Sequence, residues 1–165
     1  MRNLIIYGTK YGCTAECANK LAASLEGQTD VLNVEQNATI DVSVYDRIII
    51  GSSVYMGQIN KKLKKFIEEH LAKLLGKETV IFICCSLPDN FNDVLAANFP
   101  EQLLANTMEK TFVGGRLDID KMKLVDRTIA KLMSKQKGDV APVAGILYDV
   151  IEDLAKRLNE HSKGA

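Results

Sequence analysis

The chain alternates between short apolar runs and longer segments whose apolar residues recur every three or four positions. The short runs predict buried strands, because they are brief, rich in Ile, Val and Cys, and bounded by glycine or polar residues. These runs comprise residues 4–7, 31–34, 44–50, 79–85 and 112–113. The periodic segments predict helices. They comprise residues 14–25, 63–75, 93–98, 122–133 and 147–158. After the third of these, Pro100 can open a short helical turn.

Strands that read as continuous apolar runs are typical of sheets covered by helices on both faces, so the sheet is expected to be parallel. The alternation with helices predicts a doubly wound α/β fold. No stretch rich in Pro, Ser or Gly divides the 165 residues, which predicts one domain over residues 1–165. In such folds ligands bind beyond the carboxyl ends of the strands. The loops of interest are therefore residues 8–14, 52–58 and 86–92.

Composition and charge argue against a nucleic-acid-binding protein, a membrane-spanning protein and an exported protein. The 21 Lys+Arg balance 21 Asp+Glu, so the chain lacks the basic excess typical of nucleic-acid-binding proteins. Its strongest apolar run, residues 80–85, is far shorter than the roughly 18 residues of a membrane span. The apolar stretch near the N-terminus is also too short for a signal-peptide core, which predicts a cytoplasmic protein.

The first loop, from Gly8 to Thr14, combines the features of a phosphate site. It lies between a predicted strand and a predicted helix, and helix N-termini attract anions. Thr9 and Thr14 supply hydroxyl groups, and Lys10 supplies a cation. The spacing matches neither G-x-x-x-x-G-K-S/T nor G-x-G-x-x-G, which disfavours a nucleotide triphosphatase and a dinucleotide-binding protein. The alternative reading is an ordinary strand–helix turn without a ligand.

The pattern hydroxyl-x-x-Gly-x-Thr, formed by Thr9, Gly12 and Thr14, resembles the FMN-phosphate loop of the flavodoxin superfamily. Residues 45–58 are similar to the third strand and flavin loop of one branch, the menaquinone-dependent protoporphyrinogen oxidases. Residues 113–117 resemble the fifth strand of that branch. The resemblance implies a flavodoxin-like sheet of strand order 2-1-3-4-5, with helices on both faces and FMN as the cofactor.

The same resemblance implies which residues contact FMN. In the first loop, this chain has Tyr11 and Cys13 where the family commonly has small or polar side chains. In the second loop, Tyr55 is expected to stack on the isoalloxazine ring, Met56 to lie against its edge, and Gly57 to allow close backbone approach. The third loop is expected to reach the pyrimidine end through its backbone. The predicted cofactor-binding residues are Thr9, Lys10, Tyr11, Gly12, Cys13, Thr14, Ser52, Ser53, Val54, Tyr55, Met56, Gly57, Ser86, Leu87 and Pro88.

The sequence does not predict a catalytic or metal-binding role for the cysteine and histidine side chains discussed next. Cys84 and Cys85 lie in an apolar run with no His or second Cys pair nearby in the sequence, so we expect small buried thiols and no metal site. Cys13 is also expected to be structural. His70 shares the apolar stripe of its helix, which predicts a half-buried, hydrogen-bonded imidazole and not a catalytic one.

A basic stretch opens the helix that contains His70. A solvated face is the ordinary interpretation of such a stretch; the alternatives are attraction of an acidic partner, of substrate propionates or of an anionic membrane surface. Any membrane contact is then expected to be peripheral, at the inner face. The lysines concerned are Lys61, Lys62, Lys64 and Lys65.

Two function classes follow from the resemblance. The first is an FMN-dependent oxidoreductase that passes electrons from an organic substrate, such as a porphyrinogen, through FMN to a quinone. The second is a flavodoxin-type electron carrier that docks between redox proteins. Low-potential carriers of this superfamily are acidic around the flavin, whereas this chain is neutral and its second loop has no carboxylate. The charge pattern therefore favours the oxidoreductase.

Overall fold

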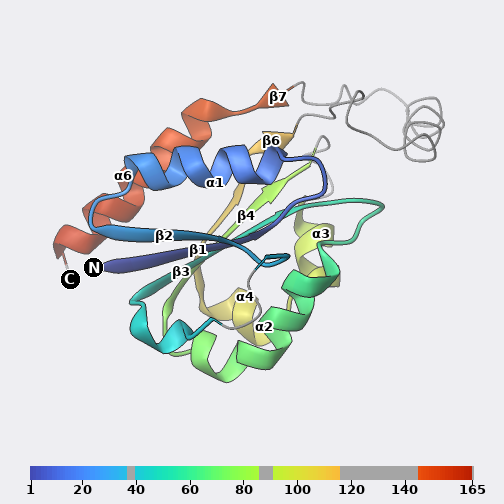
Figure 1. The fold of residues 1–165 in the computed structure, drawn as a ribbon, viewed down its shortest axis with the longest axis horizontal. Helices are drawn as coiled ribbons and strands as arrows, with labels where there is room; N and C mark the ends of the chain where they lie inside the picture. Colours follow the sequence, from blue (N-terminus) through green and yellow to red (C-terminus); the bar gives the residue numbers. More distant parts are fainter. Residues whose placement is uncertain (37–39, 86–90, 116–144, 165) are drawn as a thin grey trace.

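The computed structural model describes residues 1–36, 40–85, 91–115 and 145–164 (Figure 1). A central sheet has the order β2-β1-β3-β4-β5, and each neighbouring pair is parallel. This confirms the predicted fold and strand order. Its strands are β1 (Arg2–Gly8), β2 (Gln28–Asn33), β3 (Arg47–Ser53), β4 (Glu78–Cys84) and β5 (Thr107–Phe112).

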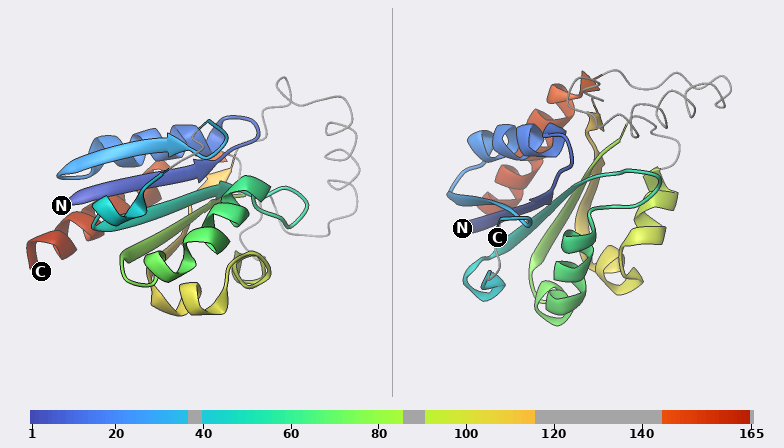
Figure 2. Two further views of the ribbon diagram at one scale, coloured as in Figure 1. Left: turned by 60° about the horizontal axis from the view of Figure 1, so that its bottom comes forward. Right: turned by 45° about the vertical axis from the view of Figure 1, so that its right-hand side comes forward.

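Helices cover both faces of the sheet, as Figures 1 and 2 show. One face carries α1 (Cys13–Ser24) and α6 (Tyr148–Gly164). The other face carries α2 (Lys61–Leu74), α3 (Phe91–Asn98) and α4 (Glu101–Asn106), together with the short 3-10 helix η1 (Val42–Val44). A small antiparallel pair, β6 (Gly114–Gly115) and β7 (Gly145–Ile146), lies beside the main sheet.

Two apolar cores result from the alternation of side chains along the strands. Ile5 and Ile49 point to the core under α1 and α6, whereas Leu4 and Ile48 point to the core under α2, α3 and α4. All four side chains are fully buried. This two-sided burial explains why the central strands read as continuous apolar runs.

The fifth strand differs from its prediction. The sequence pattern placed it at residues 112–113, but β5 runs from Thr107 to Phe112. Buried Thr107 and Thr111 alternate with exposed Met108 and Lys110 in this edge strand, so β5 contains no continuous apolar run. The third strand also begins later than predicted, at Arg47, since Val44 belongs to η1 and is exposed. The helix predicted at residues 122–133 lies outside the described residues.

Strand β2 begins earlier than predicted, at Gln28, and the other described elements lie close to their predicted ranges. The last helix, α6, covers the predicted apolar positions and continues to Gly164. Pro100 stands at the start of α4, as its fixed φ favours. Because the sheet is parallel, β1, β3 and β4 end at the same edge, where the fold is expected to bind a ligand.

Candidate functional site

The loop after β1 leads into α1 with a backbone suited to an anion. Gly12 occupies the N-cap with a φ of 92°, in the left-handed region that favours glycine. No side chain caps the helix. The Thr9 hydroxyl instead accepts a hydrogen bond from the N–H of Gly12 at 3.0 Å, which holds the loop in its turn. The positive end of α1 therefore faces the loop, and the N-cap residue, Gly12, has no side chain that could accept from the first turn.

Thr14 provides an unusual polar atom at this helix N-terminus. Its side chain is fully buried, yet Oγ1 has no hydrogen-bond partner within the described residues. A buried hydroxyl without a partner costs about 1–3 kcal/mol. A phosphate oxygen held by the first turn of α1 would remove that cost, so the residues present fit the phosphate group of FMN.

The second loop is a tight turn at residues 55–58. The backbones of Tyr55 and Gln58 exchange two hydrogen bonds, of 2.9 and 3.1 Å. Met56 and Gly57 both have positive φ, of 52° and 75°, as a type I′ turn requires. Met56 is consequently 63% exposed, at the tip of the turn.

Asn98, at the end of α3, positions this turn. Its side-chain nitrogen donates to the carbonyl oxygen of Gly57 at 2.8 Å, and its oxygen accepts from the N–H of Ile59 at 3.1 Å. Asn98 is 2% exposed. The sequence analysis missed this residue because its contacts span some forty residues of chain; an amide in an apolar helical segment was the only signal.

A cavity of about 750 Å³ lies between the first and second loops. It is lined by Thr9, Lys10, Tyr11, Ser53, Tyr55 and Lys64, among others. The Lys10 ammonium lies 3.6 Å from the centre of the Tyr55 ring, so a cation–π contact joins the two loops. A flavin stacked on this face of Tyr55 would require Lys10 to move.

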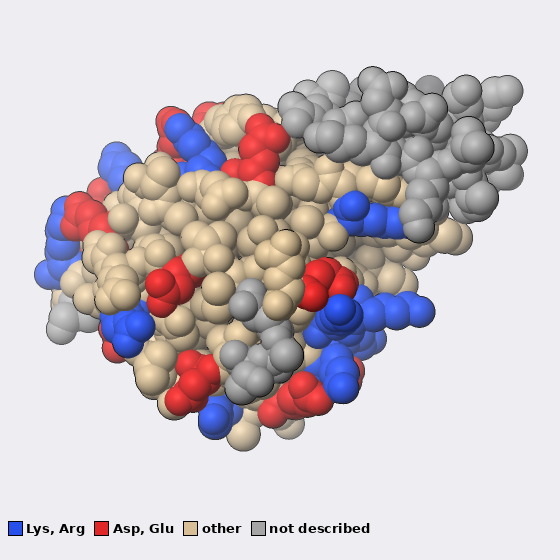
Figure 3. Space-filling view, in the orientation of Figure 1, with Lys and Arg blue, Asp and Glu red and all other residues tan. Residues whose placement is uncertain are grey.

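The basic stretch at the start of α2 divides into two pairs. Lys61 and Lys64 line the large cavity. Lys62 instead lies 2.7 Å from a carboxylate oxygen of Glu35, and Lys65 lies 3.5 Å from one of Glu69. Basic and acidic side chains are accordingly interspersed over this part of the surface (Figure 3).

Asn60 and Glu35 link this region to the loops. The Asn60 side chain caps α2 by accepting from the N–H groups of Lys62 and Leu63, and its nitrogen donates to Glu35 at 3.0 Å. Contacts with Lys62 and then with Asn60 hold the pKa of the Glu35 carboxyl below its usual value. The sequence analysis did not single out either residue.

The chain matches the family described as flavodoxin domain over residues 4–141. This match covers most of the sequence. The chain belongs to the flavodoxin family. The assignment confirms the predicted resemblance and agrees with the strand order of the central sheet.

Relatives of this flavodoxin-family chain include an enzyme. It is 28% identical over 157 residues to the Escherichia coli K12 protein named protoporphyrinogen IX dehydrogenase [quinone], with 84% of this chain and 81% of that protein covered. The flavodoxin of Streptococcus pneumonia TIGR4 shares the fold at a TM-score of 0.61 and 18% identity, covering 98% of this chain and 99% of that one. A Lactobacillus acidophilus flavoprotein in complex with FMN has a TM-score of 0.53 and 17% identity, covering 67% of this chain and 92% of that one.

Many of the predicted FMN-binding residues lie at the carboxyl edge of the sheet, but not all of them face a cavity. Ser53 and Val54 line cavities there, whereas Ser52 is buried and its hydroxyl donates to the carbonyl oxygen of Ser53 and accepts from the N–H of Asn60. Ser52 therefore joins β3 to α2. Ser86, Leu87 and Pro88 lie outside the described residues.

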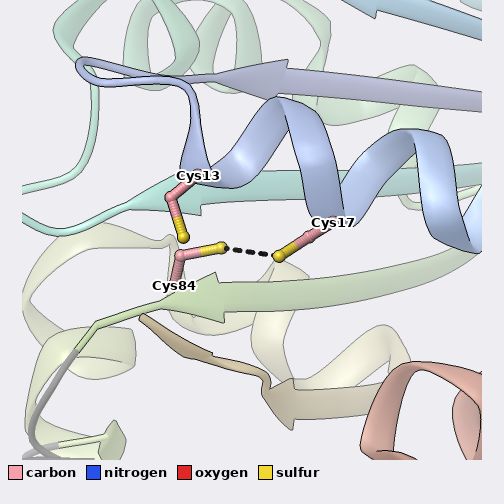
Figure 4. A group of neighbouring side chains, drawn as sticks. All are labelled: Cys13, Cys17 and Cys84. Atoms are coloured by element: carbon pink, nitrogen blue, oxygen red, sulfur yellow. Dashed lines mark hydrogen bonds between the residues drawn. The ribbon is translucent and has the colours of Figure 1, made fainter. Parts of the chain in front are cut away.

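Three of the four cysteines form a cluster that the sequence analysis missed. The thiols of Cys13 and Cys17 on α1 and of Cys84 at the end of β4 point toward one another (Figure 4). Their sulfur atoms all lie within 4.8 Å of one another. Cys84 is buried, as expected, but no local pattern indicated the cluster, because sheet packing brings together residues that are distant in the sequence.

Burial and mutual contact favour the protonated form of the Cys17 and Cys84 thiols. Contact with the Cys13 thiol and burial raise the pKa of Cys17 to about 12, although contact with Cys84 partly opposes this. Contacts with Cys13 and Cys17, together with burial, also raise the pKa of Cys84 well above its usual value. All four cysteines are free of disulfides.

His70 has the structural role predicted for it. Its Nδ1 lies 3.0 Å from the carbonyl oxygen of Phe66, and its ring stacks on the Phe66 ring at 4.4 Å.

No helix of the described residues has both the length and the apolar character needed to cross a membrane.

Proposed function

We propose that this flavodoxin-family protein is an FMN-dependent oxidoreductase that takes electrons from a porphyrinogen and passes them to a quinone. FMN is the cofactor of this family, and it supplies one- and two-electron redox chemistry when bound. The observation that carries the proposal is the buried Thr14 hydroxyl, which lacks a partner within the described residues beside an α1 N-terminus that has no side-chain cap.

The chain's own residues would divide the work of binding FMN. Thr14 and the first amides of α1 would hold the phosphate, with Thr9 fixing the loop through Gly12. Tyr55 would contact the ring, since its side chain lines both cavities at this edge. Asn98 would act only on the shape of the second loop, through Gly57 and Ile59.

The cavity offers a site for an anionic substrate. Its lining includes the cations Lys10, Lys61 and Lys64 and one carboxylate, that of Glu35. Glu35 is itself paired with Lys62, so the lining keeps a positive excess. Porphyrinogens carry propionate side chains, and lysine ammonium groups attract such carboxylates over about 8 Å at physiological salt. The similarity to a protein named protoporphyrinogen IX dehydrogenase [quinone] supports this substrate class and a quinone acceptor. A quinone acceptor fits a cytoplasmic protein in peripheral contact with the membrane.

The assay that tests the proposal is anaerobic oxidation of protoporphyrinogen IX by the FMN-loaded protein with a menaquinone acceptor. We expect quinone-dependent turnover, and a higher KM when Lys61 and Lys64 are both changed to Gln. The matched control changes Lys65 and Lys73, which pair with carboxylates outside the cavity lining, to Gln and should leave KM nearly unchanged. Absence of turnover, with a long-lived semiquinone in a redox titration, would favour the electron-carrier class instead.

A further inference from the structure

We propose that the thiols of Cys13, Cys17 and Cys84 form a binding site for one Cu(I) ion, between α1 and the end of β4 (Figure 4). The proposal is independent of the FMN assignment, because it rests on the positions of three sulfur atoms. None of the three residues binds the metal in isolation; the site exists because the fold places one strand end under one turn of helix.

The sulfur positions are close to those of a three-coordinate site. Cys13 and Cys17 are four residues apart on α1, so both thiols lie on the same face of the helix. The Cys17 and Cys84 sulfur atoms are 3.6 Å apart, and all three lie within 4.8 Å of one another. Metal–sulfur bonds of about 2.3 Å in a trigonal plane would place the sulfurs about 4 Å apart. Side-chain shifts below about 1 Å would therefore complete the site.

The ligand set selects a soft ion. Thiolates favour Cu(I) and Zn(II) over hard cations, and Zn(II) prefers a fourth ligand. The cluster contains three ligating residues, and no His, Asp, Glu or further Cys of the described residues joins it. Cu(I) is satisfied by three sulfur ligands, so the geometry points to Cu(I). On binding, the metal replaces the thiol protons, which leave to solvent, and no oxidation or reduction occurs.

The surroundings of the cluster suit a thiolate-bound ion. Cys17 is 1% exposed and Cys84 is 3% exposed, so water competes little for the metal. Cys13 is the first residue of α1, where the positive end of the helix offsets the negative charge of the thiolates. The smaller cavity at the carboxyl edge is lined by both Cys13 and Cys84, which gives an ion a route from solvent.

The fourth cysteine provides a matched control. Cys85 follows Cys84 directly and lines the same small cavity, but it is not part of the cluster. A Cys85→Ser variant therefore keeps the three proposed ligands while removing one thiol. Cys13→Ser, Cys17→Ser and Cys84→Ser each remove one ligand and the same number of thiols.

The test titrates the protein, purified under reducing conditions in a flavin-free and a flavin-loaded form, with Cu(I) against a chromogenic chelator. We expect one Cu(I) per chain for the wild type and for Cys85→Ser. Each of the three ligand variants should bind at least tenfold more weakly. X-ray absorption of the wild-type complex should show three sulfur neighbours at about 2.3 Å.

Several results would overturn the proposal. They are equal weakening by Cys85→Ser, no binding to the wild type at chelator-buffered Cu(I), or a first shell dominated by nitrogen or oxygen. A disulfide between two of the cluster thiols in reducing buffer would also overturn it. If a ligand variant fails to fold, as its circular dichroism would show, the absorption spectrum of the wild-type complex still decides the question.

Discussion

The two ends of the sheet treat their polar groups differently. At the amino ends of the strands, Arg47 is 1% exposed, and its guanidinium donates to Glu78 at 2.9 Å and to Ser162 at 3.2 Å. At the carboxyl ends, Thr14 is equally buried, but its hydroxyl has no partner in the described part of the chain. At the amino end, the buried polar groups pair with one another and so stabilise the fold. The carboxyl end keeps a polar group available for a ligand.

Asn3 shows that an unmet hydrogen bond is not by itself a site. Within the described residues, Asn3 Oδ1 is the other buried side-chain atom without a partner, and it lies at the amino end. Its amide nitrogen, however, donates to the Glu26 carbonyl and to the Thr29 hydroxyl. Thr14 differs in two ways: its single polar atom has no partner, and it stands in the first turn of a helix without a side-chain cap.

The largest expected effect lies at the amino end. Glu78→Gln should lower the free energy of unfolding by about 3 kcal/mol, because it leaves the buried Arg47 charge without a carboxylate. The affinity for FMN should not change. Urea unfolding and an FMN titration measure the two quantities. Glu26→Gln, which removes an exposed ion pair with Lys163, is the control and should cost under about 1 kcal/mol. A weaker FMN complex in Glu78→Gln would contradict the separation of the two ends.

The converse change lies at the carboxyl end. Thr14→Val should weaken FMN binding by about 1–3 kcal/mol, because it removes one hydrogen bond to the phosphate. The flavin-free protein should lose no stability, since that hydroxyl has no partner within the described residues. Calorimetric titration and thermal unfolding measure these effects. Thr29→Val at the amino end should do the opposite, costing about 1 kcal/mol of stability without changing the FMN affinity.

A smaller effect is expected on the flavin potential. Reversing Lys61 and Lys64 to Glu should lower the two-electron potential by tens of millivolts, because the reduced flavin gains negative charge. The shift should shrink at high salt. Reversing Lys65 and Lys73, which contact Glu69 and Asp41 outside the cavity lining, is the control and should shift the potential less. Spectroelectrochemical titration measures the potentials of both variants. Equal shifts would mean that Lys61 and Lys64 are ordinary solvated residues with no particular effect on the flavin.

The smallest expected effect concerns Glu35. Its pKa lies below the ordinary value of 4.5 because Lys62 and Asn60 favour the carboxylate. The group therefore contributes stability above pH 4.5, and this contribution is lost as the pH falls through the lowered pKa. Titration by NMR of the carboxyl carbon should show the lowered midpoint, and Lys62→Gln should move it upward. An unchanged midpoint in that variant would mean that Asn60 alone sets it.

The central strands and the first loop could be predicted because their signals are local. Continuous apolar runs indicate two-sided burial, and Gly12 followed by Thr14 indicates a helix N-terminus built for an anion. The edge strand β5 was not predicted because its buried positions, Thr107 and Thr111, are polar and it has no apolar run. The roles of Asn98, Asn60 and the cysteine cluster were not predicted for a different reason. Their partners are distant in the sequence, and only the packing of helices on the sheet brings them together.

Titration of the flavin-free wild-type protein with FMN and with riboflavin tests the central claim, a phosphate site at the carboxyl edge, most directly. The two ligands differ only in the phosphate, so the ratio of their dissociation constants isolates the first loop. The account predicts that FMN binds with one molecule per chain and at least tenfold more tightly, because each charge-assisted hydrogen bond contributes about 1.5–3 kcal/mol. Equal affinities for FMN and riboflavin would contradict it.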